Sequence, residues 1–119
     1  MIRAIIIDDE QKARIRLASH LKKYCPEVTI LDLADNIEKG VNAINKHNPN
    51  VVFLDTVYSN GSGFNLLKQL KEINFKIVFV TSFNQYAIKS FKYNAFDYLL
   101  KPLDIGELCA TVKRLKSVV

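Results

Sequence analysis

Short runs of apolar residues, most of them β-branched, alternate along the chain with longer stretches of mixed character. Five such runs predict β-strands: Ile2–Ile7, Thr29–Leu33, Val51–Leu54, Ile77–Val80 and Tyr98–Leu100. The first, third and fourth are continuous and contain few polar residues. Runs of this kind are typical of parallel strands that helices cover on both faces. We therefore expect a buried parallel sheet.

The stretches between the runs carry apolar residues at helical spacing. The shared faces are Leu17, Leu21 and Tyr24; Ile37, Val41 and Ile44; Leu66, Leu67 and Leu70; and Ile105, Leu108, Val112 and Leu115. Gln85–Phe91 gives a shorter and weaker helical pattern. Alternating strands and helices indicate an α/β fold with right-handed crossovers, a doubly wound five-stranded parallel sheet.

Polar residues cluster where the expected strands end. Asp8 and Asp9 follow the first strand, Asp55 ends the third, Thr81 ends the fourth and Lys101 follows the fifth. Ligands of open parallel sheets bind outside the carboxyl ends of the strands, where the strand order reverses. For the order 2-1-3-4-5 this point lies between strands 1 and 3, so the three aspartates should converge there.

Three carboxylates at one place repel one another, by about 4 kcal/mol for two charges ~4 Å apart at an effective dielectric near 20. A cation must offset this repulsion, and a few hard oxygen ligands suit Mg²⁺. Lys101 would add a positive charge and Thr81 a hydroxyl donor. An oxygen nucleophile, a metal and donors for phosphoryl oxygens are the parts that phosphoryl transfer requires.

Each of these residues also has an ordinary structural explanation. Asp8 and Asp9 could cap the following helix, and Asp55 could begin a turn. The pair formed by Lys101 and Pro102 is common in loops. The coincidence of five such residues at four strand ends favours a site.

Composition narrows the class of protein. A chain of 119 residues with 49% hydrophobic and 24% charged residues fits one globular domain, residues 1–119. No apolar run reaches the length of a membrane span, and no signal-peptide pattern opens the chain. The net charge of +5 is spread along the chain, without a basic run that would indicate nucleic-acid binding. Cys25, Cys109, His20 and His47 lack the spacing of zinc ligands, and the cysteines are expected to be unreactive thiols.

Over nearly its whole length the sequence resembles the receiver domains of two-component response regulators. The motifs are IIIDDE at 5–10, VVFLD at 51–55, GF at 63–64, FVTS at 79–82 and FDYLLKP at 96–102. An acidic pair, a lone aspartate, a hydroxyl and an aromatic residue three positions before Lys-Pro occur in order. The stretch QYAIKSFKYNAFDYLLKP also resembles receivers that precede a LytTR-type DNA-binding domain.

The resemblance implies a flavodoxin-like receiver fold and a role for each motif residue. Asp55 would accept a phosphoryl group from a histidine kinase, and Lys101 would contact that group, or pair with Asp55 without it. The expected Mg²⁺ ligands are Asp9, Asp55, the backbone carbonyl of Val57 and, through water, Asp8. Thr81 and Tyr98 would form the switch pair, and a cis peptide bond before Pro102 would direct Lys101 to the site.

The resemblance also implies a cytoplasmic, non-enzymatic signalling protein without membrane contact. DNA would be bound only through a domain beyond Val119. The face made by the fourth helix, fifth strand and fifth helix would carry the signal and could form a homodimer. Its candidate residues are Tyr86, Lys89, Lys92, Asp97 and Arg114.

One departure from the family pattern and one pair of apolar residues carry further expectations. Tyr58 and Ser59 replace a usual Met-Pro pair, so we expect a more mobile loop over Tyr58–Ser62. Val57 and Phe83 flank the expected phosphoryl position, and neither side chain can orient a water molecule. We therefore expect slow hydrolysis of the phosphoaspartate.

Two other functions stay open at the level of sequence. One is a receiver-shaped interaction module that no longer takes phosphate, which the intact set of polar residues argues against. The other is a phosphatase of the haloacid dehalogenase type, which also uses aspartate, Mg²⁺, threonine and lysine. That family places its nucleophile in a D-x-D pattern after the first strand, whereas Asp8 and Asp9 are adjacent here.

Overall fold

A computed structural model describes all residues, 1–119, as five long parallel strands with connecting helices. The strands of the main sheet are β1 (Ile2–Ile7), β2 (Val28–Ala34), β3 (Val51–Leu54), β6 (Lys76–Thr81) and β7 (Asp97–Leu100). The helices are α1 (Gln11–Tyr24), α2 (Ile37–His47), α3 (Gly63–Lys68), α4 (Ala87–Ser90) and α5 (Ile105–Lys116). All five expected strands are present, each within one residue of its predicted ends.

The strand order is β2-β1-β3-β6-β7, which is 2-1-3-4-5 when the five long strands are counted in sequence. Every neighbouring pair in this sheet is parallel. The prediction of a doubly wound five-stranded sheet is therefore confirmed. The order reverses between β1 and β3, so a crevice is expected at their carboxyl ends.

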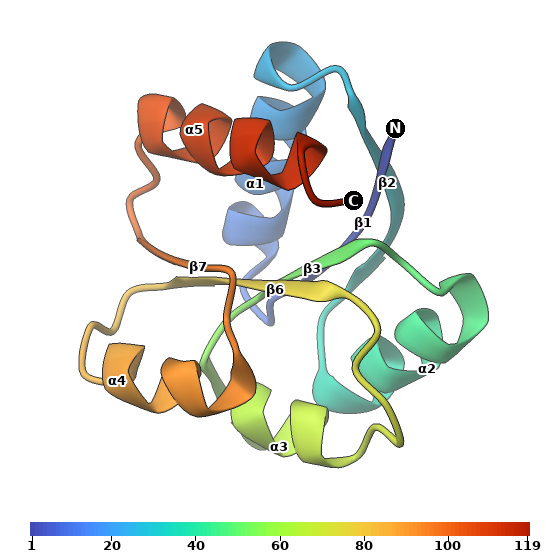
Figure 1. The fold of residues 1–119 in the computed structure, drawn as a ribbon. Coiled ribbons are helices and arrows are strands. Elements are labelled where there is room, and N and C mark those ends of the chain that lie inside the picture. Colours follow the sequence, from blue (N-terminus) through green and yellow to red (C-terminus); the bar gives the residue numbers. More distant parts are fainter.

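Helices cover both faces of the sheet. Figure 1 shows α1 and α5 above the sheet and α2, α3 and α4 below it. Two apolar cores follow from this arrangement, because successive residues of a strand point to opposite faces. In β1, for example, Ile6 packs under α1 and α5, whereas Ile5 and Ile7 pack against α2 and α3. Burial on both faces explains why these strands are continuous apolar runs.

Local signals at the helix ends agree with the observed boundaries. Asn36 caps α2 by accepting a hydrogen bond from the amide of Lys39 at 2.8 Å, and Asp104 caps α5 through the amide of Glu107 at 3.0 Å. Ser62 and Asn65 form a capping box that starts α3. Such caps satisfy amides that have no partner inside the helix.

Two segments differ from the sequence-based expectation. Val57–Tyr58 and Gly61–Ser62 form an antiparallel hairpin, β4–β5, where no strands were expected. The helix expected over Gln85–Phe91 is an α-helix only over Ala87–Ser90, and a 3-10 turn over Phe91–Tyr93 follows it. Asn94 ends that turn in the left-handed region, at φ 55°.

Candidate functional site

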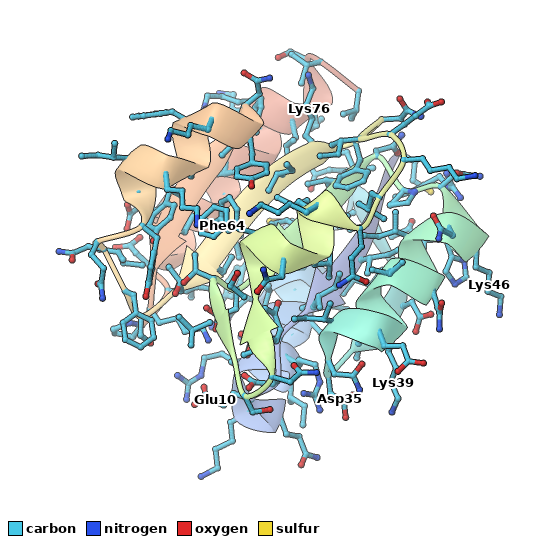
Figure 2. All side chains as sticks on the ribbon, turned by 90° about the horizontal axis from the view of Figure 1, so that it is seen from below. Glu10, Asp35, Lys39, Lys46, Phe64 and Lys76 are labelled. Carbon is cyan, nitrogen blue, oxygen red and sulfur yellow. The ribbon has the colours of Figure 1, made fainter.

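Three carboxylates meet at the carboxyl ends of β1 and β3. One oxygen from each of Asp8, Asp9 and Asp55 lies within 4.8 Å of the other two. Asp8 and Asp55 are buried and Asp9 is exposed, so the cluster opens to solvent on one side. Figure 2 shows Glu10, the residue after this acidic pair, at one edge of the molecule, and Lys76, at the start of β6, at the opposite edge.

Lys101 reaches the carboxylates from the segment that follows β7. Its Nζ atom lies 2.7 Å from Oδ2 of Asp8 and 2.9 Å from Oδ2 of Asp55. The peptide bond between Lys101 and Pro102 is cis. The lysine side chain is only 16% exposed, so both ion pairs are largely shielded from solvent. In this structure the ammonium group therefore bridges two of the three acids.

The electrostatics of the cluster reflect burial and these ion pairs. Burial raises the pKa of Asp8, although the hydrogen bond from Lys101 opposes the change. Burial alone would lower the pKa of Lys101, but its hydrogen bonds to Asp8 and Asp55 outweigh that effect and raise the pKa. The lysine is thus held in its charged form beside carboxylates that would otherwise repel one another.

The donors expected for a phosphoryl group also lie at this edge. Thr81 is fully buried at the end of β6, and its Oγ1 lies 2.8 Å from Oγ1 of Thr56. It also accepts a hydrogen bond from the amide of Phe83 at 3.3 Å. The hydroxyl of Tyr98 donates to the carbonyl of Phe83. Thr81 and Tyr98 are therefore linked through the backbone of one residue, Phe83.

Tyr58 anchors the hairpin that follows Asp55. Its side chain is buried, its hydroxyl donates to the carbonyl of Ile7 at 2.7 Å, and it accepts a bond from the amide of Asp55 at 3.1 Å. The mobility expected of Tyr58–Ser62 stays a prediction, and the bonds by which the Tyr58 hydroxyl ties this segment to the ends of β1 and β3 argue against it. Burial raises the pKa of Tyr58 well above its usual value, with the charge of Asp55 adding to the effect.

Asp8 and Asp9 do not cap α1. The residue at the N-cap is Glu10, and no side chain caps this helix. Oδ1 of Asp8 accepts a hydrogen bond from the amide of Glu10 at 2.9 Å, and Oδ2 of Asp9 accepts one from the amide of Ser59 at 3.1 Å. These bonds aim the two carboxylates toward Asp55 and the hairpin. The alternative explanation of the acidic pair as a helix cap is therefore not supported.

The donor set fits a hard cation. Carboxylate oxygens from three residues converge, and Val57, whose carbonyl is the fourth expected ligand, lies two residues beyond Asp55 in β4. Oxygen ligands with room for water and a phosphate oxygen are what Mg²⁺ prefers. The side chains present are thus compatible with Mg²⁺.

Sequence reasoning did not identify Thr56 or Tyr58 as parts of this site. Both are buried and both make hydrogen bonds to its members. The available signal at Thr56 was a second polar residue after a buried strand, and the signal at Tyr58 was a large aromatic residue close to the expected phosphoacceptor. Neither signal indicates which residue the side chain would bond to.

The remaining candidates lie away from the acidic cluster. Arg114 pairs with Asp97 between α5 and β7, and Nζ of Lys89 lies 4.6 Å from the ring centre of Phe64. Tyr86 and Lys92 flank α4. Cys25 and Cys109 are free thiols with sulfur atoms 3.8 Å apart, and burial raises the pKa of Cys25 to about 12. No helix is both long enough and apolar enough to cross a bilayer.

Comparison with known proteins places the chain among signalling proteins. Residues 4–113 match the model of the response regulator receiver domain. The chain is 46% identical over its full length to an uncharacterized response regulatory protein of Vibrio parahaemolyticus and covers 49% of it. Identity is 40% to the sensory transduction protein LytT of Bacillus subtilis, over 99% of this chain and 49% of that protein. It is also 40% to the transcriptional regulatory protein BtsR of Escherichia coli, over 98% of this chain and 49% of that protein.

Solved structures agree with the family match. A LuxR-family DNA-binding response regulator from Staphylococcus aureus superimposes with a TM-score of 0.86 at 28% identity, over 97% of this chain and 98% of that one. The response regulatory domain of mrkE from Klebsiella pneumoniae shares the fold at a TM-score of 0.88 and 23% identity, covering 98% of this chain and 96% of that one. The chain spans about half the length of the curated relatives it matches. With the receiver fold, an acidic cluster at its switch point and a family match over residues 4–113, the chain belongs to the response regulator receiver domain family.

Proposed function

We propose that Asp55 is the phosphoacceptor of this receiver domain and takes its phosphoryl group from a histidine kinase. The observation that carries the proposal is the setting of its carboxylate. The side chain is 9% exposed, lies 2.9 Å from the ammonium group of Lys101 and shares its crevice with two further acids. An oxygen nucleophile there can attack phosphorus while fixed charges stabilise the transferred group.

Each neighbour has a role in this proposal. Asp8, Asp9, Asp55 and the carbonyl of Val57 would hold Mg²⁺, which when bound neutralises the carboxylates and the phosphoryl oxygens. Lys101 would leave Asp55 and pair with the phosphoryl group. Phosphorylation of Asp55 would add a charge of about −1.5 to −2 and three acceptor oxygens beside a lysine and buried hydroxyls.

Switching would follow from the new acceptors. The hydroxyl of Thr81 would turn to a phosphoryl oxygen, and Tyr98 would follow, because both residues contact Phe83. This would bias the segment after β6 and the face of α4, β7 and α5 between two arrangements. That face is the proposed output surface and the proposed contact between two copies of the domain.

The proposal for the whole protein is a cytoplasmic transcription regulator. In it, residues 1–119 form the receiver, and a LytTR-type DNA-binding domain follows in the natural chain. Its support is the likeness to LytT, named a sensory transduction protein, and to BtsR, named a transcriptional regulatory protein, both about twice as long as this chain. Sequencing the natural reading frame past Val119 tests this proposal directly, and a frame that ends there would refute it.

Incubation with Mg²⁺ and acetyl phosphate, followed by intact-mass measurement, tests the phosphoacceptor. We expect the wild type to gain one phosphoryl group and Asp55→Asn to gain none. Omission of Mg²⁺ should abolish the gain. Absence of the gain in wild type, or its persistence in Asp55→Asn, would favour the interaction module that takes no phosphate. The family match favours a signalling receiver over the phosphatase alternative, and absence of turnover of simple phosphate esters would exclude the phosphatase.

A further inference from the structure

Thr56 connects the proposed phosphoacceptor to the proposed switch hydroxyl. Its amide donates to Oδ1 of Asp55 at 2.6 Å, and its Oγ1 lies 2.8 Å from Oγ1 of Thr81. Thr56 is 1% exposed and Thr81 is 0% exposed. The two threonine hydroxyls thus form a pair that is shielded from water and joined to Asp55 through the backbone amide of Thr56.

This pairing opposes the movement that switching requires. To bond a phosphoryl oxygen, the hydroxyl of Thr81 must leave the hydroxyl of Thr56. The buried hydroxyl of Thr56 then loses its bond to Thr81, and the loss of a buried hydrogen bond is costly. The new bond to a charged acceptor exceeds this cost, because charge-assisted hydrogen bonds are the stronger ones. The threonine pair therefore reduces the free energy gained when Thr81 bonds the phosphoryl group, but it does not prevent the movement of Thr81.

We propose that Thr56 is a positioning residue that holds Thr81 in its unphosphorylated arrangement and so sets how readily the domain switches. The inference rests on the proposed function, in which Thr81 contacts the phosphoryl group. Val52, Phe53 and Leu54 of β3 pack in the two cores and carry no polar group. Asp55 and Thr56 are the first two polar residues after this strand.

Thr56→Val tests the inference because it removes the hydroxyl and keeps the shape. The resting state loses a hydrogen bond, and the switched state loses a buried hydroxyl that has given up its bond to Thr81. Both effects favour the switched state. With Mg²⁺ present, beryllofluoride, a phosphoryl mimic, should bind about tenfold more tightly to Thr56→Val than to wild type, by calorimetric titration. Thr56→Ser, which keeps the hydroxyl, should bind like wild type.

A second background shows whether the effect passes through Thr81. In Thr81→Ala the hydroxyl pair is already absent, so adding Thr56→Val should leave the beryllofluoride affinity unchanged. A readout without any ligand is the amide resonance of Phe83, which donates to Thr81 in this structure. That resonance should shift in Thr56→Val toward its position in the beryllofluoride complex, and should not shift in Thr56→Ser.

The outcomes separate the inference from the proposed function. If wild type does not bind beryllofluoride, the proposed function fails and the inference falls with it. If wild type binds but Thr56→Val binds equally or more weakly, the inference is overturned and the proposed function stands. Equal tightening in the Thr81→Ala background would also overturn it. Thr56→Ala lacks the hydroxyl as well and must change the affinity in the same direction, so it replaces Thr56→Val if that variant does not fold.

Discussion

Single hydroxyl groups hold the segment around Asp55 in place. The hydroxyl of Tyr58 reaches the carbonyl of Ile7 and the amide of Asp55, so it bridges the ends of β1 and β3 at the point where they separate. The ring supplies apolar packing in the core below the sheet. A methionine at this position would pack but could not form these bonds. Tyr58 therefore holds this segment by hydrogen bonds that the family's usual methionine could not form.

Removal of this hydroxyl should destabilise the fold. Tyr58→Phe leaves the carbonyl of Ile7 without one of its partners in a buried place, and we expect a loss of about 1–3 kcal/mol in the free energy of unfolding. Urea denaturation measures it. Tyr24→Phe is the matched control, because Tyr24 is 42% exposed and should change stability little. Equal stability of the two variants would show that the bridge contributes nothing.

Within the proposed function, the lifetime of the phosphoryl group should also depend on single residues. Val57 is half-buried in the hairpin and Phe83 is partly exposed after β6, and neither can orient a water molecule. Val57→Asn supplies an amide at that position and should shorten the lifetime several-fold. Measuring the decay of the phosphorylated protein by mass tests this, with Val57→Leu as the apolar control. Equal decay in wild type and Val57→Asn would contradict the expected role of Val57.

The sequence was sufficient to predict the site residues that stand at the ends of strands. Asp8, Asp9, Asp55, Thr81 and Lys101 stand at strand ends, and the parallel topology brings such ends to one edge. Thr56 and Tyr58 were not assigned, because their roles depend on side-chain contacts between separate strands. Contacts of that kind depend on rotamers and packing, which a hydrophobic pattern does not encode.

At the scale of elements, the start of α3 is fitted closely against the end of β3. A β-carbon at Gly63 would overlap the backbone carbonyl of Asp55, and backbone atoms cannot move aside cheaply. The amide of Gly63 donates to the carbonyl of Thr56 at 3.0 Å, so the helix cannot move away without losing this bond. The Gly-Phe motif noted in the sequence thus has a steric basis at its glycine.

Gly63→Ala should therefore destabilise the protein, by about 1–3 kcal/mol as expected for an overpacked position. Gly106→Ala in α5 is the comparison: its new methyl group would lie 3.0 Å from Oδ1 of Asp104, the oxygen that caps α5, and this side chain can shift whereas the carbonyl of Asp55 cannot. Alanine also favours a helix over glycine, so little net change is expected there. Thermal unfolding of both variants measures the difference. A Gly63→Ala variant as stable as Gly106→Ala would contradict the steric argument.

Element-level prediction succeeded where the pattern was long. Each of the five strands has at least four residues, most of them apolar, and helices α1, α2 and α5 each have about three to four turns with apolar residues at helical spacing. The hairpin β4–β5 has two residues in each strand, which is too short to show alternation. The fourth helix was expected over Gln85–Phe91 from a weak pattern that includes the apolar residues Ile88 and Phe91. In the structure both are mostly solvent-exposed, at 79% and 74%.

At the scale of the whole molecule, this exposure leaves apolar surface beside the proposed switch. Ile88 and Phe91 are three residues apart along one helical stretch, so they lie on the same side of it. The sheet's own cores are filled without them. Within the proposed function, a second copy of this domain that meets the same face is the occupant that would bury them. The ion pair between Arg114 and Asp97 lies on the neighbouring elements and provides a polar margin.

Self-association should then depend on these two side chains and on the state of Asp55. We expect beryllofluoride with Mg²⁺ to strengthen dimer formation in wild type, and Ile88→Glu to weaken it about tenfold, because a buried charge opposes association. Sedimentation velocity over a concentration series measures both effects. Ile15→Glu is the matched control, because Ile15 is also exposed but belongs to α1, away from α4. Equal weakening by both variants would indicate non-specific association, and a monomer in every state would refute the dimer through this face.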